Sequence, residues 1–226
     1  MKKIYISPEN RPKPHGPYIV GGAYEHDVCC EIAAYEKAEL ERCGFAVKIA
    51  APSATMAARC KEANDGDYDL YQTLHSNAGG GTGATCLYYG KVGGASYRAN
   101  QMAYEELTKL YPSKRGIVDG TNYYENKNTN MVSVYPEIAF HDNEQDAAFI
   151  LANKKQIAKA LARAICRYFG VDYVEESSDE PVENPPVGNG GKPLYRVFQQ
   201  VGAFESAENA RNMAESIDGN TMVLWG

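Results

Sequence analysis

The sequence lacks several features that would place it in a common class of protein. No apolar run approaches the roughly 18 residues of a membrane-spanning helix, so we expect no membrane partner. Acidic residues outnumber basic ones by 29 to 23, for a net charge of −6. This argues against a nucleic-acid partner, because phosphate contacts need a basic surface. Residues 1–7 include two lysines but no apolar core follows them, so we expect a first strand, no signal peptide and synthesis in the cytoplasm.

The motifs of several catalytic classes are also missing. The glycine-rich segment 79–83 lacks the Lys-Ser/Thr ending of a phosphate-binding loop and does not open a helix, which argues against phosphate binding. The Gly-x-Ser-x-Gly motif of serine hydrolases is absent. The six cysteines include no Cys-x-x-Cys pair. Without an export signal, we interpret them as small buried hydrophobic residues rather than as a disulfide framework.

The composition that is present is that of a globular protein rich in tyrosine. Its 226 residues (24.8 kDa) are 44% hydrophobic and 23% charged, and a domain of this size can bury a core without disulfides or metal. The aromatic residues are 17 Tyr, 6 Phe and 1 Trp. A tyrosine ring has an apolar face and a polar tip, which suits wet surfaces and sugar contacts; half-buried packing is the alternative.

Strand and helix patterns alternate along most of the chain. Short apolar segments predict strands at 3–6, 45–50, 69–74, 84–89 and 131–139. Helical spacing of apolar residues, with capping residues at the ends, predicts helices at 25–43, 53–64, 96–110 and 153–169. This alternation predicts an α/β fold with a mostly parallel, twisted sheet flanked by helices.

The composition changes sharply near residue 171. Residues 171–193 are acidic and rich in Pro and Gly, which predicts a linker between a main domain at 1–170 and a small unit at 194–226. The small unit has the pattern of a single β-α-β unit and is too short to bury its own apolar face. We therefore predict a homodimer through 194–226, with docking onto the parent domain as the alternative.

Three side chains stand at positions suited to chemistry. His75 ends a predicted strand before a loop of small residues, and ligands bind at the carboxyl ends of strands in α/β sheets. Glu137 lies in an apolar strand, where an unpaired charge is unfavourable, so it needs a metal, a proton or a basic partner. Glu25 stands at the start of the first long helix. Structural roles stay open: a core histidine, an ion pair of Glu137 with Arg115, and an acid favoured by the helix dipole.

Several short motifs follow one another in a characteristic order. They are 59–64 (R-x-x-x-A-N), 73–78 (S-x-H-x-N-A, with Thr first), 115–116 (R-G) and 137–143 (E-x-x-F-x-x-N), with Glu25 at the start of the first helix. Together they resemble the zinc-dependent N-acetylmuramoyl-L-alanine amidases of the amidase 3 family, found in autolysins and phage endolysins, over residues 2–170. The resemblance implies a peptidoglycan hydrolase that cuts the amide bond between N-acetylmuramic acid and L-alanine.

The ligand set that this resemblance implies departs from the family at one position. The family supplies its first zinc histidine immediately after strand one, where this chain has Ser-Pro-Glu-Asn at 7–10 and no histidine before His15. We predict His15, Glu25 and His75 as zinc ligands, which leave one open position for water. His26 is the rival first ligand, although successive helical side chains diverge by about 100°. A site with a weak or missing third ligand is the remaining alternative.

The resemblance also implies roles for other residues. Glu137 is predicted to take a proton from the zinc-activated water and return it to the departing amine. Asn77 and Arg115 are predicted to contact the substrate, and His141 to orient neighbouring loop groups rather than bind metal. Two other functions stay open: a zinc peptidase that cuts within the stem peptide, and a non-catalytic wall-binding protein that has lost its metal.

The small unit at 194–226 resembles half of a sporulation-related (SPOR) repeat domain, a class that binds glycan strands of peptidoglycan. The full domain has two β-α-β halves, and this chain shows the pattern of one. Without a signal peptide, we expect action on the cell wall after release through a pore or by lysis, as in a phage endolysin or a mother-cell autolysin.

Overall fold

The computed structural model describes residues 1–11 and 15–176. The predicted unit 194–226 and most of the predicted linker lie outside the described residues, so the homodimer through that unit stays a prediction. In the part that is described, no helix is both long and apolar enough to cross a membrane.

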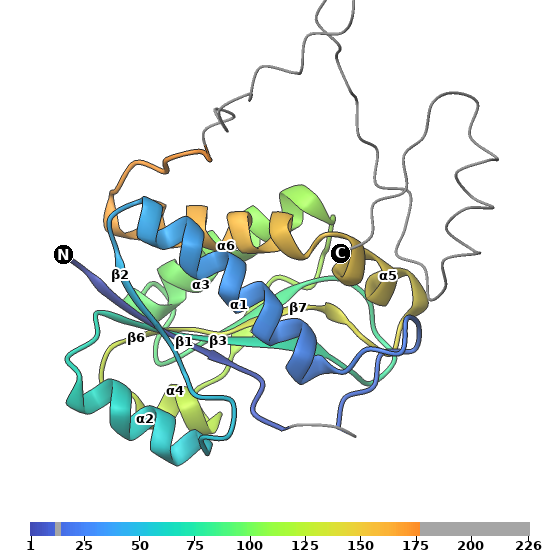
Figure 1. The fold of residues 1–226 in the computed structure, drawn as a ribbon, viewed down its shortest axis with the longest axis horizontal. Coiled ribbons are helices and arrows are strands. Elements are labelled where there is room, and N and C mark those ends of the chain that lie inside the picture. The colour runs from blue at the N-terminus through green and yellow to red at the C-terminus, as the bar shows by residue number, and fades with distance from the viewer. Residues whose placement is uncertain (12–14, 177–226) are drawn as a thin grey trace, which may run out of the picture. The chain divides into compact units, whose positions relative to one another are not determined.

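A seven-stranded sheet forms the centre of the described domain (Figure 1). Its strands are β1 (Lys3–Pro8), β2 (Ala46–Ile49), β3 (Leu70–Asn77), β4 (Thr85–Tyr88), β5 (Ile117–Asp119), β6 (Val132–Val134) and β7 (Pro136–Phe140). The strand order is β2-β1-β3-β7-β4-β5, and β6 pairs with β3. Among these strands only β4 and β7 pair antiparallel. The predicted α/β fold with a mostly parallel sheet is therefore confirmed.

Helices cover both faces of this sheet. They are α1 (Glu25–Arg42), α2 (Met56–Asp65), α3 (Ala95–Leu110), α4 (Tyr124–Asn128), α5 (Glu144–Ala152) and α6 (Lys154–Phe169). Figure 1 shows α1, α3 and α6 together on one face, and α2 with α4 on the other. The sequence pattern predicted α1, α2, α3 and α6. It did not predict α4, which has five residues, or α5, whose second half is a continuous apolar run without helical alternation.

The two faces of β3 meet different helices, because successive strand residues point to opposite sides of a sheet. Gln72 contacts Glu36 on α1, whereas Tyr71 donates a hydrogen bond to Glu125 on α4. We call these two sides of the sheet the α1 face and the α4 face. His75 lies four residues after Tyr71 and therefore belongs to the α4 face.

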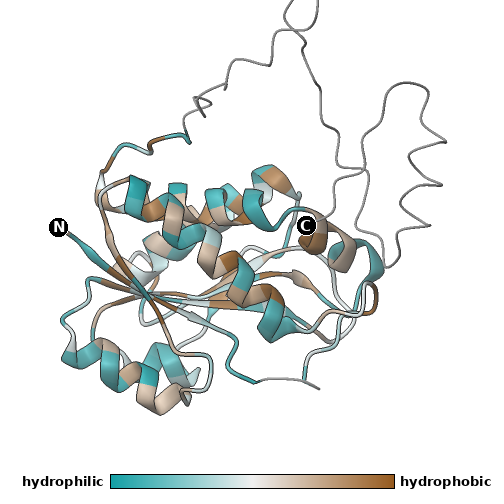
Figure 2. Cartoon of the chain, in the orientation of Figure 1, coloured by the Kyte–Doolittle hydropathy of each residue, from teal (hydrophilic) through white to brown (hydrophobic). Residues whose placement is uncertain are grey.

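The main hydrophobic core lies on the α1 face. In Figure 2, hydrophilic and hydrophobic stretches of ribbon alternate along α1 and α6, as expected for helices with one apolar side. The largest apolar side chains that these two helices bury are Ile32, Leu40, Ile157, Leu161 and Ile165. Each such side chain contributes about 1.5–3 kcal/mol of burial free energy. The α1 face thus anchors the fold, and the α4 face carries only shorter helices.

The end of the described chain extends this domain beyond the predicted boundary at residue 170. The backbone amide of Val171 donates to the Cys166 carbonyl at 2.9 Å, and that of Val174 to the Cys43 sulfur at 3.3 Å. Glu175 forms an ion pair with Arg163 at 2.6 Å. Residues 171–176, which their composition assigned to the linker, therefore pack on the domain, whose described part ends at Glu176.

Candidate metal and catalytic site

Three side chains with metal-binding atoms converge at the carboxyl end of the sheet. The Nδ1 atom of His75 lies 3.1 Å from Glu9 Oε2 and 3.2 Å from Glu25 Oε1. The ligand atoms of all three residues lie within 4.8 Å of one another. Glu9 and Glu25 are buried, and His75 is partly buried. Within residues 1–11 and 15–176, this is the one group of His, Cys, Asp or Glu side chains with such geometry.

The distances between these atoms fit a tetrahedral metal site. Zinc bonds to imidazole nitrogen and carboxylate oxygen are about 2.0–2.2 Å long, which places neighbouring ligand atoms about 3.3 Å apart. The two distances from His75 Nδ1 are close to that value. The imidazole nitrogen of His75 faces two carboxylates, and these three groups are all donors to divalent cations. The residues present therefore fit a zinc ion.

Strand pairing explains how Glu9 reaches this position. Glu9 follows β1 directly, and its backbone amide donates to the Leu74 carbonyl on β3 at 3.0 Å. His75 is the next residue on β3, so the two side chains come from neighbouring strands at one level of the sheet. His15 is exposed and does not belong to the cluster. The structure thus brings together Glu25 and His75 from the predicted ligand set, with Glu9 where His15 was predicted.

The third member of the cluster is held by the start of α1. Glu25 is its first residue, and Glu25 Oε1 accepts a hydrogen bond from the Ser76 backbone amide at 2.9 Å. Gly16 packs directly against this side chain: an added Cβ would lie 2.8 Å from the Glu25 Cβ, and the Gly16 φ is +61°. A residue other than glycine there would push Glu25 away from His75.

Glu9 has two further partners that hold it in place. Arg11 donates to both carboxylate oxygens, with Nε at 2.9 Å from Oε1 and an Nη at 3.0 Å from Oε2, and its backbone amide also reaches Oε1 at 2.7 Å. His26 Nδ1 lies 2.5 Å from the Glu9 carbonyl oxygen, and the other ring nitrogen faces Cys30 Sγ at 3.7 Å. His26, the rival ligand from the sequence, therefore contacts the backbone of Glu9 and not the cluster.

The electrostatics of the cluster are those of closely spaced opposite charges. Burial alone would lower the pKa of His75, but hydrogen bonds to Glu25 and Glu9 raise that pKa well above its usual range. Burial would raise the pKa of Glu9, but hydrogen bonds from His75 and Arg11 hold it well below its usual range. A cation between these carboxylates is thus strongly favoured, whether it is a protonated imidazole or a metal ion.

Glu137 lies next to this cluster through β-sheet register. It is the residue of β7 that pairs with His75 of β3, so both side chains lie on the α4 face. Burial raises the pKa of Glu137 to about 7; the charge of His75 opposes this shift, and those of Glu25 and Glu9 add to it. Its Oε2 atom is buried and has no hydrogen-bond partner. A carboxylate with a pKa near neutrality and a free oxygen suits proton transfer.

The other residues that the sequence singled out lie around this centre. Arg115 is exposed, with its guanidinium 4.7 Å from the centre of the Phe140 ring. The Asn77 side-chain oxygen accepts from the Ala78 amide at 2.8 Å. Neither has a described contact with the three-residue cluster. His141 Nδ1 lies 2.9 Å from Ser76 Oγ, next to the amide that binds Glu25, in agreement with its predicted orienting role.

The R-x-x-x-A-N motif has a structural role beside the site. Arg59 is fully buried on α2, and it donates to Ser7 Oγ at 3.1 Å and to the Pro8 carbonyl. These contacts hold the end of β1, from which Glu9 follows. Asn64 donates to the Asn128 carbonyl at 2.9 Å and so links α2 to the end of α4.

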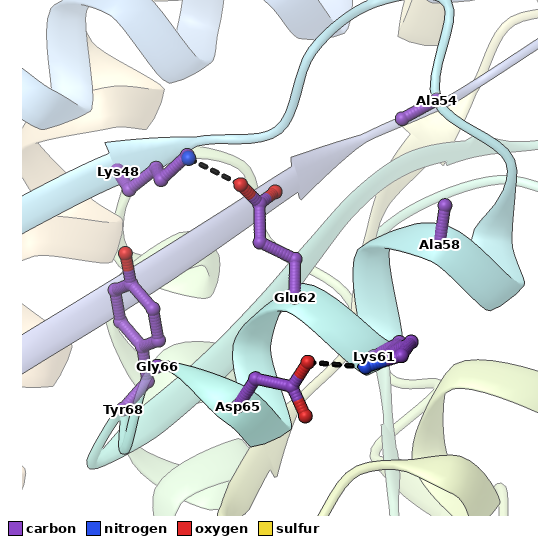
Figure 3. Close-up of a pocket in the computed structure, with 8 residues that line it drawn as sticks. All are labelled: Lys48, Ala54, Ala58, Lys61, Glu62, Asp65, Gly66 and Tyr68. Atoms are coloured by element: carbon purple, nitrogen blue, oxygen red, sulfur yellow. Dashed lines mark hydrogen bonds and ion pairs between the residues drawn. The ribbon is translucent and has the colours of Figure 1, made fainter.

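Two surface pockets lie away from the cluster. One, of about 600 Å³, lies against α2, and Figure 3 shows its charged residues paired with one another, Lys48 with Glu62 and Lys61 with Asp65. The other, of about 540 Å³, is lined by residues 81–83 and 112–115 and includes Lys114 and Arg115. The first offers no unpaired charge for a ligand, whereas the second is cationic.

Sequence reasoning missed Glu9 as a member of the site. The available signal was its position, since it directly follows the first strand where a ligand was expected. The search for a histidine passed over it. Tyr135 was missed too: its ring stacks on the His75 imidazole at 5.0 Å with an angle of 10° between the planes.

The fold and this donor set define a candidate metal centre on a mostly parallel α/β sheet, and known proteins carry the same architecture. The structure of N-acetylmuramoyl-L-alanine amidase AmiC2 of Nostoc punctiforme has a TM-score of 0.68 at 20% identity, covering 75% of this chain and 97% of that one. An N-acetylmuramoyl-L-alanine amidase from Clostridium difficile 630 gives 0.69 at 20% identity, with 75% and 97% coverage. At these identities the likeness shows the fold.

The sequence identifies the family. Residues 12–167 match the Amidase_3 family, N-acetylmuramoyl-L-alanine amidase. The chain therefore belongs to the N-acetylmuramoyl-L-alanine amidase family. It is also 25% identical over 162 residues to N-acetylmuramoyl-L-alanine amidase CwlM of Bacillus licheniformis; this match covers 71% of the chain and 57% of CwlM.

Proposed function

We propose that this chain hydrolyses the amide bond between N-acetylmuramic acid and the L-alanine of peptidoglycan, with a zinc ion held by Glu9, Glu25 and His75. The observation that carries the proposal is the position of Glu137, a carboxylate with a pKa of about 7, in register with the metal-binding histidine. Family membership supports the choice of bond. The place of action is the cell wall, where this substrate lies.

Each side chain of the site then has a chemical task. A bound zinc ion supplies a Lewis acid that polarises the scissile carbonyl and acidifies the attacking water. Glu137 accepts a proton from that water through its free Oε2 and returns it to the departing nitrogen of L-alanine. The Ser76 amide and Gly16 keep Glu25 in its ligand position.

Arg11 offsets the unusual charge of this ligand set. Two imidazoles and one carboxylate would leave a zinc centre with a net charge of +1, whereas Glu9, Glu25 and a neutral His75 leave it neutral. The two-pronged pair of Arg11 with Glu9 adds one positive charge to the centre and fixes the carboxylate that carries the excess negative charge. We propose that Arg11 thereby keeps the centre electrophilic, as hydrolysis of an amide requires.

Arg115 and Asn77 are proposed substrate contacts at the carboxyl ends of β7 and β3. The exposed guanidinium of Arg115 and the neighbouring Lys114 line a pocket of about 540 Å³. A cationic pocket of this kind suits the carboxylates of a stem peptide. Asn77 ends the strand that carries His75 and offers its amide nitrogen to a peptide carbonyl.

The test is digestion of purified peptidoglycan by the full chain, with mass spectrometry of the released fragments. We expect intact stem peptides with a free L-alanine amine, and glycan strands with free lactyl carboxylates. The Glu137→Gln variant serves as the control for a contaminating hydrolase. Cleavage within the stem peptide would indicate the peptidase alternative, and zinc-free, inactive protein that stays inactive after zinc is added would indicate the non-catalytic alternative.

The predicted homodimer through 194–226 has its own test, because that unit lies outside the described residues. We propose that the unit pairs with the same segment of a second copy, since one β-α-β unit cannot bury its apolar face alone. Light scattering on the full chain should give twice the mass of one chain at micromolar concentration. A monomer would refute the proposal.

A further inference from the structure

The α4 face of the sheet runs from the candidate site across β7 and β4 to the edge strand β5. His75 pairs with Glu137, and Glu137 pairs with Thr85 on β4, so these three residues share one face. Leu87 lies two residues after Thr85 and pairs with Val118 on β5, which puts both on that face too. The face that carries the metal ligands thus continues to the edge strand, where it is apolar.

Two aromatic rings, those of Tyr135 and Tyr123, form a row that begins at the proposed metal-binding histidine. Tyr135, directly before β7, stacks on the His75 imidazole at a centroid distance of 5.0 Å. Tyr123 packs edge-on against Tyr135 at 5.3 Å, with an angle of 69° between the rings. The Tyr123 ring therefore lies within about 10 Å of the imidazole. Tyr135 is 7% exposed and Tyr123 is 46% exposed, so the row leads from the site to solvent.

The segment before Tyr123, at the exposed end of the row, is held to the neighbouring segment by hydrogen bonds. Several large apolar side chains stand exposed in β5 and in the segments that follow β4 and β5: Tyr89, Val92, Val118, Tyr123 and Tyr124. Two hydrogen bonds join these segments, from the Gly120 amide to the Tyr88 carbonyl at 2.8 Å and from the Gly90 amide to Thr121 Oγ1 at 3.0 Å. An exposed apolar group on a well-anchored loop beside a catalytic centre is a feature of ligand recognition.

We propose that Tyr123, supported by Tyr135, is the subsite for a sugar ring of the glycan strand, next to the bond that is cut. The inference rests on the proposed function and adds the direction in which the substrate lies. A pyranose ring presents a face of C–H groups that packs on an aromatic ring, and its hydroxyls can bond to the phenol tip. In this arrangement the neutral sugar of the substrate lies along Tyr135 and Tyr123, and the peptide with its carboxylates lies toward the cationic pocket.

The layout of β7 supports this direction. Tyr135 stands before its first residue, Glu137 lies within it, and Phe140, against which Arg115 packs, is its last residue. The aromatic and cationic contacts thus lie at opposite ends of the strand that carries the proposed acid–base. A substrate whose scissile amide joins a sugar-bearing lactyl group to an anionic peptide matches that order.

The experiment compares two substrates that differ only in the sugar. One is N-acetylmuramoyl-peptide, and the other is the same peptide carrying a D-lactoyl group without the ring. Tyr123→Ala in the full chain should lower kcat/KM for the sugar-bearing substrate by roughly 3- to 10-fold, mainly through KM, the range for one lost aromatic contact. It should leave kcat/KM for the lactoyl-peptide and the zinc content unchanged. Tyr123→Phe, which keeps the ring, should retain most of the wild-type preference.

Tyr88→Ala is the matched control, because Tyr88 packs on Tyr97 of α3, on the other face of β4. It should leave the ratio of the two substrates unchanged. An equal loss on both substrates after Tyr123→Ala would overturn the proposal, since Tyr123 would then act by holding Tyr135 and His75. If Tyr123→Ala left kcat/KM unchanged for both substrates, that result would overturn the proposal as well.

A binding measurement separates this proposal from the proposed function. Peptide-free glycan strands are titrated into the full-length Glu137→Gln chain, with and without Tyr123→Ala, so that no catalysis is needed. The tyrosine change should weaken binding by a similar 3- to 10-fold factor. If neither substrate is hydrolysed by the wild type, the proposed function fails, yet the two titrations still decide the sugar subsite: equal affinities contradict it.

Discussion

The two faces of the sheet each bury a glutamate, and the difference between the two shows how neighbours decide the role of a carboxylate. On the α1 face, Glu36 is fully buried, and within the described residues its carboxylate accepts hydrogen bonds from the Gln72 side-chain amide alone, at 2.7 Å. Burial raises the pKa of Glu36 to about 8, against the opposing hydrogen bond from Gln72. On the α4 side, Glu9 is equally buried, but His75 and Arg11 hold its pKa well below the usual range. Glu36 is a neutral group in a core, and Glu9 is a charged member of the candidate metal cluster.

Glu137 lies between these extremes. It shares burial with Glu36 and charged neighbours with Glu9, and its pKa is about 7. Its free Oε2 has no counterpart at Glu9, both of whose oxygens are bonded. The comparison therefore predicts that substitutions at these three glutamates will have three different signatures: loss of catalysis, loss of metal, and a change in the pH dependence of stability.

The largest expected effect follows from removal of the proposed acid–base. Glu137→Gln should lower kcat by roughly 10²–10⁴, because a positioned acid–base contributes that much. It should keep the zinc content and the unfolding temperature, since Glu137 is not in the ligand cluster. Rate measurements on solubilised peptidoglycan, with metal analysis of the same samples, test both. A fully active variant, or one without zinc, would show that the role is misassigned.

Loss of the two-pronged contact between Arg11 and Glu9 should have an intermediate effect on activity. Arg11→Gln should lower kcat/KM by roughly 10- to 100-fold, as changes at groups that orient metal ligands do. Arg11→Lys keeps the positive charge but loses the two-pronged contact, so its kcat/KM should lie between those of Arg11→Gln and the wild type. The zinc stoichiometry of both should be unchanged at saturating metal. Wild-type kinetics in Arg11→Gln would remove Arg11 from the account.

Zinc binding should depend on pH, because the imidazole must lose its proton. In the metal-free chain the pKa of His75 lies well above its usual range, so the ring is protonated at neutral pH. Zinc affinity should then rise with pH up to that pKa, and binding should release a proton. Calorimetry in buffers with different ionisation enthalpies measures this release directly. A release of no protons at pH 7 would contradict the arrangement of His75 between two carboxylates.

The smallest expected effect on activity, and a clear one on stability, concerns Glu36. An acid whose folded pKa is raised stabilises the fold below its unfolded pKa, and that stability is lost as pH rises through the folded value. The contribution of Glu36 to the free energy of unfolding should therefore fall by roughly 1 kcal/mol per pH unit between about pH 5 and 8. Glu36→Gln should remove this contribution, so that its stability falls less with pH than that of the wild type, and it should be the more stable protein at pH 8 because it has no buried acid to ionise.

Urea unfolding of both proteins at pH 5, 6.5 and 8 measures the effect. Activity should be unchanged in Glu36→Gln, which makes it the matched control for Glu137→Gln as a change at a buried glutamate. Parallel pH profiles of stability for the two proteins would mean that Glu36 is ionised in the fold.

Much of the architecture was predictable because it depends on local patterns. Apolar periodicity and capping residues located α1, α2, α3 and α6, and α6 ends at Phe169, the predicted end of that helix, because Gly170 takes the left-handed conformation with φ 65°. The position of His75 at a strand end and of Glu137 in an apolar strand also marked the site. Residues 171–176 were misassigned because their acidic composition resembles a linker, although Val171 and Val174 bond to the domain.

The side chain that follows β1 and meets His75 could not be predicted from residue types alone. His15 is predicted because the family that the chain resembles has a histidine after strand one and His15 is the first histidine there, but strand register determines which side chain meets His75. Glu9 lies beside His75 because its backbone amide bonds to the carbonyl of Leu74, one residue before the histidine. The contact between Tyr135 and Tyr123 was equally hidden, since it joins a strand start to a helix start through tertiary packing.

The central claim is that Glu9, Glu25 and His75 hold one zinc ion, and the most direct test is the metal content of three purified variants. The account predicts about one zinc per chain for the wild type and for His15→Ala, and well under one for Glu9→Ala and His75→Ala, with the same circular dichroism for all four. Zinc retained in Glu9→Ala and lost in His15→Ala would contradict it, and would return the first-ligand role to the exposed histidine.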